Sequence, residues 1–186
     1  MFEQLLIKIS QALGKNFLPY MVIGGQAVLL YGEPRLTRDI DITLGVNIDK
    51  LDKLLNTIRE IGLTPLPENI ENFVEKTFVL PVKDKNTKIR VDFIFSQTSY
   101  EKQAINRANT IKIKSKTVRF ASLEDMIIHK IFAGRPRDLE DVRSILLKNP
   151  VFDKDYIFKW LKEFDNTLDQ SRFRKTFENI LQNTDL

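Results

Sequence analysis

The most restrictive feature of this 186-residue sequence is the segment 39–46, in which acidic and aliphatic residues alternate. A period of two is typical of a strand with one buried face and one polar face. On such a strand the side chains of Asp39 and Asp41 point to the same side. Two neighbouring carboxylates repel each other, so the pair favours a fold that holds a cation beside this strand.

Acidic residues spaced two apart are common in a chain with 25 acids, and roughly three such pairs are expected by chance. The pair at 39 and 41 is distinguished because it lies in a strand-like segment. The other pairs lie in or beside predicted helices, where residues two apart diverge by about 200°. Only the strand pair therefore predicts two carboxylates on one face.

A third acid, Asp92, lies in a second strand-like segment, 88–95, with apolar residues on both sides. Carboxylate oxygens are the ligands that Mg²⁺ prefers. Three acids from two strands could hold two metal ions about 3.5–4 Å apart, an arrangement suited to nucleotidyl transfer. The sequence therefore predicts that Asp39, Asp41 and Asp92 converge on a site for Mg²⁺ or Mn²⁺.

Gly24 and Gly25 follow a short buried strand, predicted over 18–23, and precede a short helix, predicted over 26–31. Two glycines let backbone N–H groups approach an anion closely at a helix N-terminus. A glycine pair alone is also an ordinary turn. Its combination with the three acids favours a turn that binds the phosphates of a nucleotide.

Hydrophobic patterning predicts an α/β fold in two parts. The first part, 1–120, mixes helices and strands. Its further predicted elements are helices over 2–13, 49–61 and 99–108, and strands over 77–82 and 111–120. From residue 122 onward every predicted element is a helix. We expect an α/β core over 1–120 with a helical C-terminal region, 121–186, packed on it.

Composition excludes several kinds of site. The absence of Cys excludes disulfides, thiolate nucleophiles and cysteine zinc sites, and the single histidine, His129, excludes multi-histidine metal sites. The longest apolar stretch, 21–31, is too short to span a membrane and contains glycines. The first residues do not resemble a signal peptide. We therefore expect a cytoplasmic protein without a membrane partner.

Positive charge is concentrated between residues 101 and 120, which contain six basic residues and one acid. Such an excess favours an anionic partner such as RNA. If 111–120 is one strand, Lys112, Lys114 and Lys116 share a face. The same lysines would equally protect an exposed sheet edge from aggregation.

The motifs IGG, DID and VDF resemble those of the nucleotidyltransferase superfamily, which has the polymerase-beta-like fold. The longer phrases GGQAVLLYGEPRLTRDIDI and HKIFAGRPRDLEDV resemble the AbiEii-type toxins of toxin–antitoxin pairs, over residues 22–142. The resemblance implies that Asp39 and Asp41 hold the metal ions. It also implies that Asp92 completes the site and helps to deprotonate the acceptor hydroxyl.

Further roles follow from the same resemblance. Gly24 and Gly25 would bind the nucleotide phosphates, although many members have Ser where this chain has Gly25, so a hydroxyl contact is missing. Lys130 and Asp138 match positions that bind phosphate and support the site. The alternative interpretation of Lys130 is a surface lysine, and that of Asp138 is a helix cap.

Arg35 and Arg38 flank the acidic strand, where they could donate charge-assisted hydrogen bonds to a triphosphate or pair with acids such as Glu33. We count Arg38 among the predicted nucleotide-binding residues.

The resemblance thus implies a Mg²⁺-dependent nucleotidyltransferase. It would move a nucleoside monophosphate from an NTP such as ATP to a hydroxyl of a tRNA 3′ end or a protein. A toxin role would bring a cognate antitoxin protein as a partner. The alternative is a catalytically weakened protein of the same fold that binds RNA or another partner.

Overall fold

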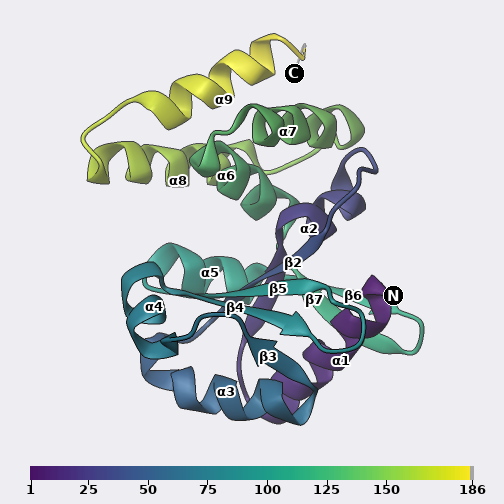
Figure 1. Cartoon of the computed structure of the whole chain (residues 1–186). Helices are drawn as coiled ribbons and strands as arrows, with labels where there is room; N and C mark the ends of the chain where they lie inside the picture. Colours follow the sequence, from purple (N-terminus) through teal and green to yellow (C-terminus); the bar gives the residue numbers. More distant parts are fainter. Residues whose placement is uncertain (185–186) are drawn as a thin grey trace. The chain divides into compact units, whose positions relative to one another are not determined.

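The alternating acidic segment forms strand β2, Asp39–Leu44, in the computed structural model, which describes residues 1–184. Within this range seven strands form one mixed sheet in the order β3-β4-β5-β2-β1-β7-β6 (Figure 1). The other strands are β1 Tyr20–Ile23, β3 Leu63–Pro65, β4 Val79–Asp84, β5 Arg90–Phe95, β6 Asn109–Ile113 and β7 Lys116–Phe120. The predicted α/β class is confirmed.

The centre of the sheet combines parallel and antiparallel pairs. β2 runs antiparallel to β1 and parallel to β5, and β1 runs parallel to β7. On one face of β2 and β5 the residues Ile40, Ile42, Val91 and Phe93 are completely buried. The acidic residues of both strands alternate with them and are therefore on the opposite face.

The chain divides into two units, and the first contains the whole sheet. It comprises Met1–Gln26 and Leu36–Ala121. Its helices are α1 Phe2–Lys15, the start of α2 Gly24–Tyr31, the 3-10 turn Ile48–Lys50, α3 Leu51–Glu60, α4 Ile70–Thr77 and α5 Ser99–Arg107. α1 contacts β7 and α3, and both helices lie along the same side of the sheet (Figure 1).

The second unit is helical and comprises Ala27–Arg35 and Ser122–Leu186. Its helices are the remainder of α2, α6 Leu123–Ala133, α7 Pro136–Lys148, α8 Lys154–Thr167 and α9 Arg172–Gln182. The Ser122 hydroxyl accepts a hydrogen bond from the Asp125 N–H, which caps α6. Gly134, with φ +64°, ends α6, and Pro136 occupies the first turn of α7.

The basic segment 111–120 is a hairpin instead of the single strand that its alternation predicts. Lys114 has φ +56° and lies in the turn between β6 and β7. Lys112 pairs with Thr117, whereas Ile113 pairs with Lys116. Because paired residues share a face and neighbours alternate, Lys112 and Lys116 lie on opposite faces. The prediction that the three lysines share one face is wrong.

Two elements were not predicted from the sequence. They are the short strand β3 and the helix α4, which both precede β4. Because α4 extends to Thr77, the strand predicted from Thr77 begins only at Val79. Asn69 caps α4 by accepting a hydrogen bond from the Asn72 N–H. Its apolar residues Ile70, Phe73 and Val74 have helical spacing, but α4 is only eight residues long and only Val74 is buried. Among the described residues no helix is long and apolar enough to cross a membrane.

Candidate active site

The parallel pairing of β2 and β5 places three carboxylates on one face of the sheet. Asp41 lies opposite Asp92, and Asp39 lies opposite Arg90. Paired residues project to the same side, and residues two apart on a strand do so as well. The acids at 39, 41 and 92 are half-buried on this face. The structure therefore places the three acids that the sequence singled out on one face of adjacent strands.

Gly24 touches the carboxylate of Asp41. A Cβ atom added to Gly24 would lie 1.9 Å from Asp41 Oδ2, and Gly24 has φ +66°. Both the contact and the backbone angle require glycine. The turn at the N-terminus of α2 is thus packed directly against the acidic strand.

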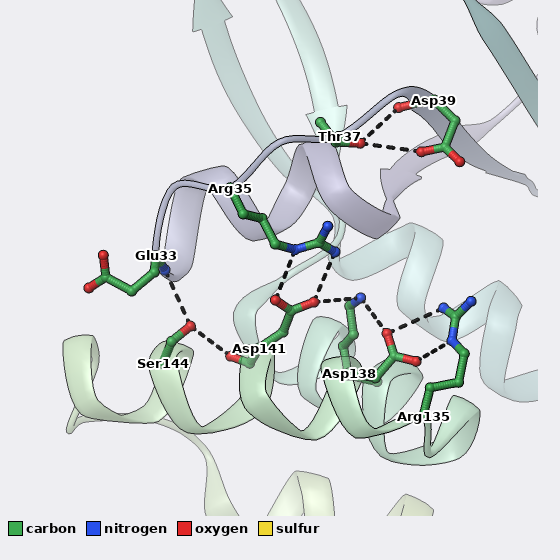
Figure 2. A network of polar contacts seen from close by, with 9 residues as sticks. Glu33, Arg35, Thr37, Asp39, Arg135, Asp138, Asp141 and Ser144 are labelled. Atoms are coloured by element: carbon green, nitrogen blue, oxygen red, sulfur yellow. Dashed lines mark hydrogen bonds and ion pairs between the residues drawn. The ribbon is translucent and has the colours of Figure 1, made fainter.

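Thr37 fills the space beside Gly25. A Cβ atom added to Gly25 would lie 2.5 Å from Thr37 Oγ1 and 2.8 Å from Thr37 Cβ. The threonine hydroxyl donates to Asp39, with 3.3 Å to both its backbone oxygen and its Oδ1 (Figure 2). A hydroxyl group is therefore present next to Gly25, although Gly25 itself lacks one. Thr37 is not among the site residues predicted from the sequence.

Arg90 is a second residue that the sequence analysis overlooked. Its Nε donates a hydrogen bond of 2.8 Å to Asp92 Oδ1. This bond, together with the negative charges of Asp92, Asp39 and Asp41, raises the pKa of Arg90 above its ordinary value, while partial burial opposes the shift. An Arg two residues before an Asp on a strand is the signal that could have identified it.

The three carboxylates are chemically suited to a divalent cation, because Mg²⁺ prefers hard oxygen ligands and these groups share one face of adjacent strands. Within residues 1–184, however, no three His, Asp or Glu side chains are gathered closely enough to form a ready cation site. Asp92 is held by Arg90 instead. The three carboxylates fit Mg²⁺ by their chemistry, but in this structure Asp92 is paired with Arg90.

Lys130 and Asp138 belong to a buried ionic network in the helical unit. Figure 2 shows Asp138 of this network with Arg135 and Asp141. Lys130 Nζ lies 2.7 Å from Asp138 Oδ1 and 2.9 Å from Asp141 Oδ2, and its side chain is only 6% exposed. Arg135 also donates to Asp138. Burial opposes ionisation of Asp138, but the hydrogen bonds from Arg135 and Lys130 lower its pKa below the ordinary value.

The same network includes Arg35, which makes two hydrogen bonds of 3.0 Å to the carboxylate of Asp141. Glu33 pairs with Lys148 instead of Arg35. Arg38 is exposed and directly precedes Asp39. Roles for Arg38, Lys130 and Asp138 in nucleotide binding stay predictions.

Comparisons with known proteins agree with this fold. A family model described as a nucleotidyltransferase of unknown function (DUF6036) matches residues 2–182. No curated protein matches the sequence significantly. An antigenic nucleotidyltransferase-like protein from Paracoccidioides brasiliensis superposes with a TM-score of 0.61 at 16% identity, over 97% of this chain and 87% of that one.

The antibiotic-resistance factor ANT(2'')-Ia has a similar structure. Its solution structure gives a TM-score of 0.56 at 18% identity, over 77% of this chain and 82% of that one. Its crystal structure in complex with adenylyl-2''-tobramycin gives a TM-score of 0.54 at 19% identity, over 77% and 87%. At these identities the likeness establishes the fold, and the fold that the motifs predicted is confirmed.

We predict that Gly25→Ser destabilises the protein by about 1–3 kcal/mol, because the new Cβ would overlap Thr37. In Gly25→Ser/Thr37→Gly the loss should be smaller than the sum of the two single losses, since the overlapping atoms are gone. Urea denaturation measures both. Gly14→Ser is the control, because nothing lies within 4 Å of a Cβ atom there. Additive losses would show that Thr37 does not fill this space.

We predict that Lys130→Met destabilises the helical unit by about 3–5 kcal/mol, because Asp138 and Asp141 would stay buried without their shared cation. The Lys148 side chain, which pairs with Glu33, is 43% exposed. Lys148→Met should therefore cost less than about 1 kcal/mol. Thermal unfolding at pH 7 compares the two variants, and equal losses would contradict a buried network.

The pH dependence of this network has a defined sign. Asp138 has a lower pKa in the folded protein than its ordinary value of 3.8, so its ionised form stabilises the fold above that pH. The contribution is lost as the pH falls from 3.8 through the folded pKa. Acid unfolding of Asp138→Asn should therefore show a weaker dependence on pH below 3.8 than the unaltered chain.

Proposed function

We propose, from the membership of this chain in the DUF6036 family of nucleotidyltransferases, that it transfers a nucleoside monophosphate from an NTP to an acceptor hydroxyl. The observation that carries this proposal is the placement of Asp39, Asp41 and Asp92 on one face of the sheet, with the Gly24 turn against Asp41. Carboxylates beside a backbone turn at a helix N-terminus suit the binding of a metal-bound triphosphate.

The acidic residues have two roles in this proposal. Asp39, Asp41 and Asp92 would hold one or two divalent cations, which supply positive charge to the phosphates when bound. Asp92 would also accept the proton of the acceptor hydroxyl. The acceptor oxygen then bonds to the α-phosphorus, the bond from that phosphorus to the β-phosphate oxygen breaks, and pyrophosphate leaves.

In this proposal the phosphates bind to the turn formed by Gly24 and Gly25 and to residues near it. The N–H groups of Gly24 and Gly25 lie at the N-terminus of α2, where the helix dipole favours an anion. The hydroxyl of Thr37, adjacent to Gly25, would supply the contact that a serine at residue 25 would otherwise make. The exposed Arg38 would donate to the triphosphate, and Lys130 and Asp138 would support the nucleotide site.

For the acceptor we propose an RNA, such as a tRNA 3′ end, or a protein, as expected of a toxin that is paired with an antitoxin. The excess of positive charge between residues 101 and 120 supports an anionic acceptor. ANT(2'')-Ia has been crystallised in complex with adenylyl-2''-tobramycin, and a small-molecule acceptor is an outcome that the experiment below distinguishes.

The alternative is a protein of this fold that binds RNA or a partner without turnover. One observation favours it: Asp92 is held by Arg90. The resemblance adds that many members have Ser where this chain has Gly25. Mg²⁺-dependent thermal stabilisation by each of the four NTPs tests for nucleotide binding, and transfer of the nucleotide tests for turnover.

We predict that Asp41→Asn reduces nucleotide transfer by about 10³-fold, because a metal loses an anionic ligand. Each of the four α-labelled NTPs is incubated with Mg²⁺ or Mn²⁺ and with bulk tRNA, a protein extract or an aminoglycoside. The stability of the metal-free variant should be equal or slightly higher, since carboxylate repulsion is reduced. Asp52→Asn, at an exposed residue of α3, is the matched control and should retain full activity.

Two results would count against the proposed enzyme. Equal label transfer by Asp41→Asn and the unaltered chain would exclude catalysis at this site. Thermal stabilisation by an NTP without transfer to any acceptor would favour the binding protein instead.

A further inference from the structure

Arg90 is the first residue of β5 and lies on the same face of the sheet as the three acids. In the register it lies opposite Asp39 of β2 on one side and opposite Lys83 of β4 on the other. Asp92 follows two residues later on the same strand and therefore projects to the same face. The ion pair of Arg90 Nε with Asp92 Oδ1 measures 2.8 Å, and the side chains are 54% and 17% exposed.

Among the three acids, the guanidinium is hydrogen-bonded to Asp92. The hydrogen bond from Arg90 to Asp92 raises the pKa of Arg90, and the charges of Asp92, Asp39 and Asp41 act in the same direction. Three carboxylates on one face repel one another when no cation is near. Arg90 is thus placed to offset this repulsion in the metal-free protein.

We propose that Arg90 is a built-in counter-cation of the acidic site, which holds Asp92 while no metal is bound and releases it when a divalent cation binds. This inference rests on the proposed function, because it takes the three acids to be the metal ligands. An oxygen of Asp92 that accepts from Arg90 has less negative charge to offer to a metal. Arg90 therefore lowers the affinity of the site for the cation while stabilising the cation-free state.

A purely structural role for Arg90 would have a different consequence. If Arg90 held Asp92 in the geometry that the metal needs, its removal would weaken metal binding. If it competes with the metal, its removal strengthens metal binding and destabilises only the metal-free protein. The two roles therefore differ in the sign of the change in affinity.

The test is a titration of the whole chain with Mn²⁺, followed by electron paramagnetic resonance of the free ion, without NTP or acceptor. Arg90→Gln should bind Mn²⁺ about 5- to 10-fold more tightly than the unaltered chain. Lys83→Gln is the matched control, because Lys83 is exposed on the same face but lacks an ion pair with Asp92. Its affinity should change less than about twofold. Arg90→Lys keeps the positive charge, so its affinity for Mn²⁺ should lie between those of the unaltered chain and Arg90→Gln.

Thermal unfolding provides a second measurement. Without metal, Arg90→Gln should unfold about 1–3 °C below the unaltered chain, since an exposed ion pair contributes little to stability. At saturating Mn²⁺ this difference should disappear, because the bound cation then offsets the carboxylates in both proteins.

The outcomes separate this inference from the proposed function. Equal or weaker Mn²⁺ binding by Arg90→Gln would overturn the counter-cation role and leave the metal site intact. Tightening of the same size in Lys83→Gln would also overturn it, because the effect would then be general electrostatics. If neither the unaltered chain nor Arg90→Gln binds Mn²⁺, the metal site of the proposed function fails, and this inference fails with it.

Discussion

The register between β2 and β5 is the constraint on which the candidate site depends. A shift of one residue would place Asp41 opposite Val91 or Phe93 and turn the acids of the two strands to different faces. The register is stabilised on the other face, where Ile40, Ile42 and their partners on β5 are completely buried. The hydrophobic core, and not the acids themselves, therefore determines where the carboxylates meet.

Close packing then limits what each carboxylate can do. Gly24 leaves no room for a side chain beside Asp41, and the Thr37 hydroxyl reaches Asp39. Asp92 is occupied by Arg90. Asp39 and Asp92 thus each accept a hydrogen bond from a neighbour in the first unit. Hydrogen bonds of this kind reduce the electrostatic cost of placing like charges together on a half-buried face.

Local patterns predicted most helices and the central strands, because amphipathic periodicity and caps such as Ser122 act over a few residues. They failed where the signal was short or ambiguous. The Ile/Lys alternation continued through Lys114, whose left-handed backbone forms the turn between β6 and β7. Alternation alone does not reveal a turn that contains no glycine or proline. α4 was missed because its apolar residues Ile70, Phe73 and Val74 span little more than one helical turn, which is too short a pattern to identify a helix.

The sequence by itself determined that two acids share a strand face, that a third lies on another strand, and that a glycine turn precedes them. These features depend on spacing along one strand or one turn. Only the tertiary structure decided that Asp41 lies opposite Asp92, that Thr37 fills the space beside Gly25, and that Arg90 holds Asp92. It also decided that Lys130 is buried between two carboxylates. These relations depend on strand pairing and side-chain packing, which connect residues that no local period relates.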